Sequence, residues 1–188
     1  MAIPLMVLRA ALAGVLLAGS VAPAAARQRA LEYEVKAQFL GHFTGFIEWP
    51  ASAFPRPDAP FRICLLGGDP FGPSLSRRLE GEQAAGRRIS VEPIKTVAAA
   101  ASCQVVFVLG ANEARADALH RTTRGRPVLV VSDAIGLLAH CAAIAFVVEA
   151  GFVRFDVNLA AITGHGLQVS PRLLRVARDA TDRYVHCD

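Results

Sequence analysis

The chain has 188 residues, of which 53% are hydrophobic and 19% are charged, and its formal net charge is +4. This length and composition indicate a globular chain with one well-covered hydrophobic core, so we expect one domain. Beyond the N-terminal segment, no stretch approaches the roughly 20 uninterrupted apolar residues of a membrane helix, so we expect the remainder of the chain to be soluble.

The first 26 residues have the pattern of a secretory signal. Arg9 supplies a thin positive region, Ala10–Val21 is apolar, and Ala24–Ala26 resembles a cleavage site for signal peptidase. We therefore predict that residues 1–26 are removed and that residues 27–188 form the mature, exported domain. A retained membrane anchor is the alternative. Nucleic acid is not expected as a partner outside the cytoplasm, although the positive charge comes almost wholly from arginine.

The first element of the mature chain is an amphipathic helix within Leu31–Pro50. Pro50 disfavours helical geometry at Trp49, so the helix should end at or just before Glu48-Trp49. An apolar stripe that must be covered consists of Val35, Phe39, Leu40, Phe43, Phe46 and Ile47. The opposite, polar face consists of Glu34, Lys36 and Gln38.

The middle of the chain alternates between short apolar runs and helical or turn segments. The runs predict strands within residues 61–66, 89–94, 104–109 and 127–131. The run at 61–66 suits a buried strand, and the continuous apolar character of 104–109 is typical of a parallel sheet covered on both faces.

The C-terminal third no longer alternates between strands and helices. Residues 143–148 and 152–157, joined by a short turn, predict an antiparallel hairpin. Ser170-Pro171 predicts a final helix to about Asp182. The elements together predict an α/β fold with a mostly parallel, doubly wound-like sheet, an antiparallel C-terminal hairpin at its edge and helices on both faces.

Two loops follow predicted parallel strands, at the edge where doubly wound folds bind ligands. One contains Gly68 and Asp69, and the other contains Ser132 and Asp133. The glycine spacing does not match a dinucleotide-binding fingerprint, and both loops are also explained as turns that cap helices. A small-ligand sensor that uses these four residues is our second functional hypothesis.

The sequence contains no catalytic constellation. It has no G-x-S-x-G motif and no cluster of carboxylates of the receiver type, so we do not predict an enzyme. His140-Cys141 and His186-Cys187 invite a zinc hypothesis. Neighbouring residues on an extended chain point to opposite faces, however, and no C-x-x-C spacing is present. We therefore predict no metal and no cofactor.

Four cysteines in an exported chain indicate disulfide bonds. Cys64 lies in the first predicted strand and Cys103 at the start of the third, and these strands are neighbours in the common doubly wound order. Cys64 and Cys103 are therefore placed to pair. Cys141 and Cys187 form a second pair, or one or both remain free.

Short motifs lie along nearly the whole chain after residue 31, and their combination is more specific than any one of them. They comprise Glu32–Leu40, Glu48–Pro50, Phe61–Gly72, Gly125–Asp133, Ile144–Phe146, Arg154–Leu159 and Ser170–Leu174. In this combination the chain resembles the family of periplasmic proteins to which YfiR belongs.

The resemblance implies a periplasmic α/β regulator, often dimeric, that is not an enzyme. Such proteins repress a membrane-anchored diguanylate cyclase, YfiN, by binding its periplasmic part, and release raises cyclic di-GMP and favours biofilm formation. An outer-membrane lipoprotein, YfiB, sequesters the repressor. Cys64 and Cys103 match one family disulfide. The second family bridge lies in the hairpin region, where this chain offers only Cys141.

The resemblance also points to a partner-binding face around Asp156, Asn158, Ile162 and Leu167. Asp156 alternates with apolar neighbours in its strand, so we expect its side chain to be accessible. Asn158 is also explained as a helix cap, and Ile162 and Leu167 fit core packing as well as a surface role.

Overall fold

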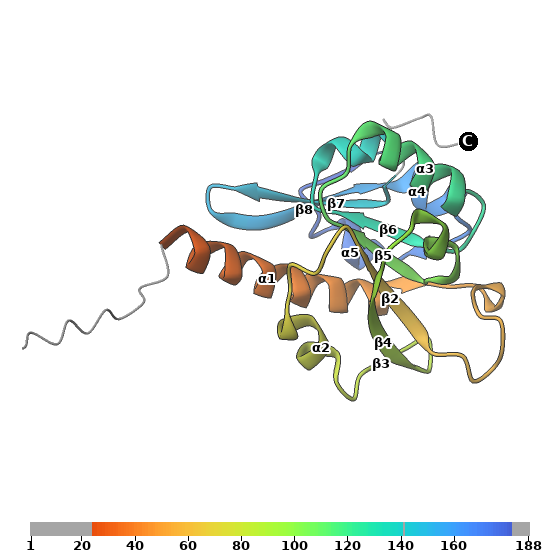
Figure 1. Cartoon of the computed structure of the whole chain (residues 1–188). Coiled ribbons are helices and arrows are strands. Elements are labelled where there is room, and N and C mark those ends of the chain that lie inside the picture. Colours follow the sequence, from red (N-terminus) through yellow and green to blue (C-terminus); the bar gives the residue numbers. More distant parts are fainter. Residues whose placement is uncertain (1–23, 141, 182–188) are drawn as a thin grey trace, which may run out of the picture.

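The computed structural model describes residues 24–140 and 142–181, and its centre is a mixed sheet (Figure 1). Its strands are β2 (Phe61–Leu66), β3 (Gln83–Ala84), β4 (Arg87–Ile94), β5 (Val105–Val108), β6 (Leu129–Ser132), β7 (Ile144–Glu149), β8 (Phe152–Asn158) and β10 (Asp179–Thr181). They form one eight-stranded sheet in the order β10-β8-β7-β6-β5-β2-β4-β3. Two short strands, β1 (Ile47–Glu48) and β9 (Gln168–Val169), pair separately.

The central parallel strands β2, β5 and β6 are buried on both faces, whereas β4 is only half-buried. In β2, Phe61, Ile63 and Leu65 belong to one core cluster, and the alternate residues Cys64 and Leu66 belong to the other. Since successive side chains of a strand point to opposite faces, continuous apolar runs are what a sheet covered on both sides requires. The predicted strand type is therefore confirmed.

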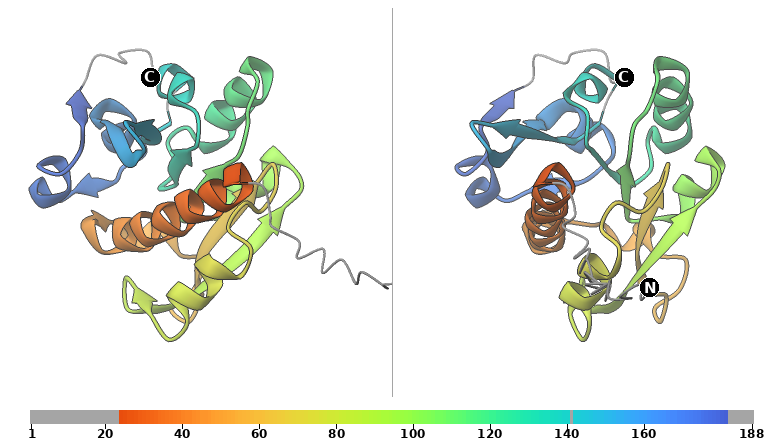
Figure 2. Two further views of the ribbon diagram at one scale, coloured as in Figure 1. Left: turned by 90° about the vertical axis from the view of Figure 1, so that its left-hand side faces the viewer. Right: turned by 60° about the vertical axis from the view of Figure 1, so that its left-hand side comes forward.

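Helices lie against both faces of the sheet (Figure 2). They are α1 (Ala24–Phe46), α2 (Pro73–Leu79), α3 (Glu113–Thr123), α4 (Leu159–Gly164) and α5 (Pro171–Leu174). The 3₁₀ helices are η1 (Ala51–Ala53), η2 (Val97–Ser102) and η3 (Ile135–His140). Residues of α1 and α2 belong to one core cluster and those of α3 and η2 to the other. The predicted α/β fold with helices on both faces is confirmed.

The buried face of α1 differs from the predicted stripe. Leu40 and Phe43 are buried as predicted, and the ring of Phe43 lies 5.1 Å from that of Phe155. Val35, however, is 38% exposed, and Lys36, predicted on the polar face, is only 3% exposed. The prediction failed because a helical period defines a stripe but does not reveal that Lys36 pairs with two carboxylates that are only partly exposed.

The C-terminal helix predicted from Ser170 was too long. Ser170 does cap a helix, since its Oγ accepts from the amide of Arg172, but α5 ends at Leu174. The chain then forms β10, which pairs in parallel with β8, and the amide of Arg178 donates to Phe155 O at 2.9 Å. The hairpin β7–β8 is thus covered by β10 and does not form the edge of the sheet.

The hairpin itself is as predicted. β7 and β8 pair antiparallel from Ile144–Val157 to Glu149–Phe152. The loop between them consists of Ala150 and Gly151, both with positive φ, which is the geometry of a type I′ turn.

The predicted disulfide between Cys64 and Cys103 is present, with a Cα–Cα distance of 6.1 Å. It closes a loop with a sequence separation of 39, for which chain entropy predicts a stabilisation of about 3 to 4 kcal/mol. The pairing of Cys141 with Cys187 lies outside the described residues, as does nearly all of the predicted signal peptide. Among the described residues, no helix is long and apolar enough to cross a membrane.

Candidate functional site

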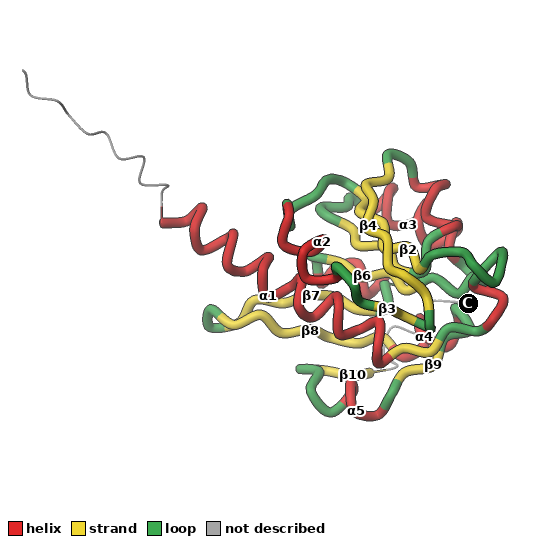
Figure 3. The backbone as a smooth tube through the Cα atoms, turned by 90° about the horizontal axis from the view of Figure 1, so that it is seen from below, coloured by secondary structure: helices red, strands yellow, loops and turns green. Residues whose placement is uncertain are grey.

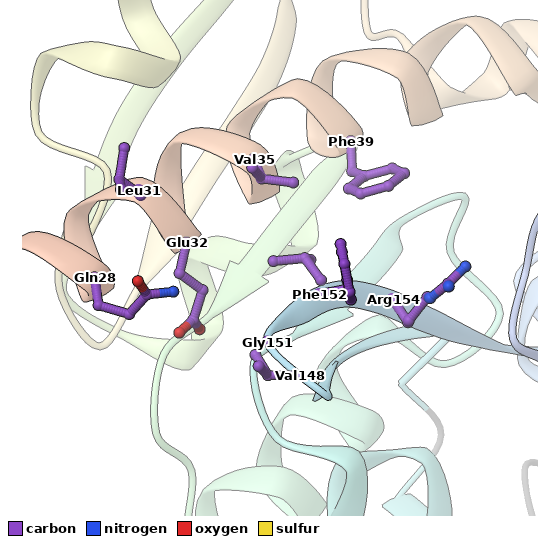
Figure 4. Close-up of a pocket in the computed structure, with 10 residues that line it drawn as sticks. Gln28, Leu31, Glu32, Val35, Phe39, Val148, Gly151, Phe152 and Arg154 are labelled. Atoms are coloured by element: carbon purple, nitrogen blue, oxygen red, sulfur yellow. The ribbon is translucent and has the colours of Figure 1, made fainter. Parts of the chain in front are cut away.

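The helix α1 and the hairpin β7–β8 extend side by side from the body of the domain (Figures 1 and 3). Side chains of the two elements line a groove between them. Its volume is about 360 Å³. One wall is the N-terminal half of α1, from Gln28 to Phe39, and the other is the end of the hairpin, from Val148 to Arg154 (Figure 4). We call this feature the α1–hairpin groove.

The α1–hairpin groove collects most of the large exposed apolar side chains. Phe152 is 66% exposed, Leu31 and Val148 are half-exposed, and Val35 also lies in the groove wall. These are four of the six large hydrophobic residues that are exposed within the described part of the chain. Apolar side chains gathered at one place on a surface indicate a site of association, because exposure of such a cluster to water is unfavourable.

A cluster of aromatic rings beneath the groove packs α1 against the hairpin. The ring of Phe39 lies 5.4 Å from that of Phe155 in β8 and 6.2 Å from that of Phe146 in β7. Since α1 is anchored to the hairpin by buried rings, the exposed residues one turn away are presented in a defined arrangement.

A buried charged cluster fixes α1 to the end of β6. The ammonium of Lys36 pairs with the carboxylates of Glu32 and Asp133, and the hydroxyl of Tyr33 donates to Asp133. Lys36 Nζ also lies 4.7 Å from the centre of the Tyr33 ring. Removing one member of a buried ion pair typically costs about 3 to 5 kcal/mol, so this cluster strongly constrains the position of α1.

The environment of Tyr33 also changes its acidity. Burial, followed by the hydrogen bond to the Asp133 carboxylate, raises the pKa of Tyr33 to about 12. The phenol therefore remains protonated at neutral pH and continues to donate to Asp133.

The four predicted ligand-loop residues are not gathered into one open site. Asp69 closes its own turn, since its Oδ1 accepts from the amides of Phe71 and Gly72 at 2.8 and 3.1 Å. Ser132 is buried and bonds to the backbone of Ala134. Asp133 is engaged with Lys36 and Tyr33 of α1, and only Gly68 borders an open hollow.

The predicted partner-binding residues are buried. Asp156 is 2% exposed and pairs through both carboxylate oxygens with Arg178, with an Nε–Oδ1 distance of 2.7 Å. Its expected accessibility was wrong, because β10 covers the edge of β8 and brings Arg178 over it. Ile162 and Leu167 lie in the hydrophobic core. A role of this region in partner binding stays a prediction.

Asn158, the fourth member of that set, has the alternative role that the sequence allowed. Its Oδ1 accepts from the amide of Ala161 at 3.0 Å, which caps α4, and its Nδ2 donates to Leu138 O at 3.2 Å. It therefore joins α4 to the segment around η3.

The sequence interpretation missed the α1–hairpin groove. A signal was present, since Leu31 and Val35 are four residues apart on one helix face, and Val148 and Phe152 flank the predicted turn. Val35 was assigned to the apolar stripe of the helix, and Val148 and Phe152 were assigned only to the strands of the hairpin. Apolar residues at the tip of a hairpin, however, have no neighbouring strand to cover them.

His165 is buried, and His120 of α3 is half-buried. His165 Nδ1 donates to Val128 O at 2.7 Å, and burial lowers the pKa values of both His165 and His120. Within residues 24–140 and 142–181, no group of three or more histidine, cysteine or acidic side chains is arranged to hold a metal ion.

These features describe an α/β domain whose most distinctive surface is apolar and suited to association. The sequence matches the YfiR/HmsC-like family, DUF4154, over residues 33–178, so the chain belongs to this family. The resemblance inferred from the motifs is confirmed.

One solved structure similar to this chain is the crystal structure of a conserved domain protein from Vibrio cholerae O1 biovar eltor str. N16961. The TM-score is 0.49 at 12% sequence identity, and the match covers 79% of this chain. The match spans 60% of the length of that protein chain.

Proposed function

We propose that this protein is exported as residues 27–188 and represses a membrane-anchored diguanylate cyclase by binding its periplasmic part. Repression lowers cyclic di-GMP and thereby biofilm formation. Family membership supports the type of partner. The observation that carries the proposal is the α1–hairpin groove, where four exposed apolar residues are held on two anchored elements.

In this proposal the apolar side chains of the groove pack against the cyclase. Large aromatic side chains contribute most to protein interfaces, and Phe152 is the most exposed of the large hydrophobic residues that the structure describes. Phe152 and Val35 stand on opposite walls, so a segment of the cyclase between them contacts both. No reacting group is needed, since regulation follows from association alone.

The test uses Phe152→Asp and Val35→Asp, which place a charge in the groove without disturbing buried contacts. Val176→Asp is the matched control, because Val176 is also well exposed but does not line the groove. We expect both groove variants to lose binding to the purified periplasmic part of a cyclase from the same genome. Cellular cyclic di-GMP should rise, whereas the control should repress like wild type. Full repression by both folded groove variants would contradict the proposal.

The region around Asp156, Asn158, Ile162 and Leu167 has a supporting role in this proposal. Because these side chains are buried, they maintain β8 and α4 and do not themselves provide the contact surface. A YfiB-like outer-membrane lipoprotein and a second copy of this chain are the further partners that the family suggests. Size-exclusion chromatography with light scattering tests the homodimer directly.

A further inference from the structure

A second hollow lies at the carboxyl edge of the parallel strands, away from the α1–hairpin groove. Its volume is about 480 Å³, within the range of small-molecule sites. The ends of β2 and β4 and the loops that follow them form it, and Arg115 of α3 reaches its rim. We call it the β2–β4 hollow.

The β2–β4 hollow lies beside the point where the chain crossovers diverge. β2 lies between β4 and β5 in the sheet. The chain leaves β2 toward α2, which shares a core cluster with α1, and leaves β5 toward α3 in the other cluster. In open α/β sheets, loops that part in this way leave space for a ligand at the carboxyl ends of the strands.

Two glycines allow the loop after β2 to pack closely on the loop after β5. Gly67 and Gly68 have φ values of +93° and +131°, and both line the hollow. A Cβ atom on Gly67 would lie 2.3 Å from Leu109 O, so no other residue fits there without moving the backbone. The loop after β2 therefore packs directly on the loop after β5.

The charges at the hollow are all positive. Lys95 and Arg115 are its only ionisable lining residues, and both are exposed. Within the described residues neither one belongs to a salt bridge, and the guanidinium of Arg115 bonds only to Gly110 O, at 3.3 Å. The nearby carboxylate of Asp69 accepts from its own turn and does not line the hollow. Two uncompensated cations thus border an otherwise apolar surface that includes Ile94 and Val97.

We propose that the β2–β4 hollow binds a small organic oxyanion, with its phosphate or carboxylate group between Lys95 and Arg115 and its apolar body against Ile94 and Val97. This inference goes beyond the proposed repression and does not depend on it. Of the four ligand-site residues predicted from the sequence, only Gly68 lines this hollow. The ligand contacts proposed for Asp69, Ser132 and Asp133 are made instead by Lys95 and Arg115.

The test is isothermal titration of the purified mature protein with phenyl phosphate, benzoate and inorganic phosphate. We expect one organic anion to bind with a stoichiometry of one and more tightly than inorganic phosphate, because only the organic probes contact Ile94 and Val97. Preference for phenyl phosphate or for benzoate distinguishes a phosphate ligand from a carboxylate ligand. Absence of binding by both organic probes at millimolar concentration would overturn the proposal.

Variants locate the binding site. We expect Lys95→Gln and Arg115→Gln each to weaken binding of the better probe about tenfold or more, as for loss of a charge-assisted hydrogen bond. Arg121→Gln is the matched control, since Arg121 is exposed on the same helix as Arg115 but does not line the hollow. Unchanged affinity in both rim variants would place the anion elsewhere and overturn the assignment.

Discussion

The α1–hairpin groove and the segment from Asp156 to Leu167 differ in how far their apolar side chains are exposed to solvent. Both regions are rich in apolar side chains, and both adjoin the hairpin strand β8. In the groove these side chains remain exposed, whereas Ile162 and Leu167 are buried under the surrounding elements. Only exposed apolar surface is available to a partner, so the groove is the stronger candidate for association. The buried segment instead stabilises the fold.

Introducing an aspartate into each region should produce the largest difference in stability between them. Ile162→Asp places a carboxylate in the core and should lower the free energy of unfolding by about 4 kcal/mol or more. Phe152→Asp should change it by about 0.5 kcal/mol or less, because Phe152 is largely exposed. Urea denaturation followed by circular dichroism measures both. Equal losses of stability would contradict the distinction between the regions.

A second prediction concerns the ion pair that covers β8. Asp156→Ala leaves Arg178 without its bidentate partner and should cost about 3 kcal/mol, at the low end for a buried pair because Arg178 is partly exposed. Asp58→Ala is the control, since Asp58 pairs with Arg56 at 3.4 Å in a fully exposed position. That change should cost about 0.5 kcal/mol or less. If Asp156→Ala were as mild as the control, β10 would not depend on this pair.

The third and smallest effect concerns the pH dependence of stability. Burial lowers the pKa values of His165 and His120 below the ordinary value of 6.5, and the cationic neighbour Arg124 adds to the shift at His120. Below about pH 6.5 the unfolded chain therefore binds more protons than the folded protein. Stability from the neutral histidines is complete above this pH and should be lost as the pH falls through the folded pKa values.

Urea midpoints between pH 7.5 and 5 measure this effect. We expect His165→Gln to flatten the dependence, because its amide still donates to Val128 O but does not titrate. His42→Gln is the control, since His42 is exposed. A dependence that is as steep in His165→Gln as in the control would assign the acid sensitivity to other groups.

Local features of the fold could be predicted because they depend on neighbours in sequence. The apolar runs of β2, β5 and β6 are buried on both faces, the Ala150-Gly151 turn joins the hairpin, and Asn112 caps α3. The disulfide followed from strand order alone, since adjacent parallel strands bring Cys64 and the start of β5 together.

The candidate site was less predictable because exposure depends on what else packs nearby. Val35 fits the spacing of an apolar helix face. That spacing does not show that the face with Leu40 and Phe43 packs in the core while Val35 remains exposed. Lys36 is buried because Asp133, 97 residues away in the sequence, lies beside it. Asp156 is buried because β10 returns to the edge of β8.

The sequence by itself determined the α/β class, the order of the main elements, one disulfide and the family. These features follow from local periodicity, turn residues and sequence motifs, which can be recognised without knowledge of long-range contacts. Long-range contacts determine which apolar residues face water, whether Lys95 and Arg115 remain unpaired and which carboxylates are covered. A side chain is buried or paired by segments that are distant in the chain, and the sequence pattern does not specify which of these segments come into contact.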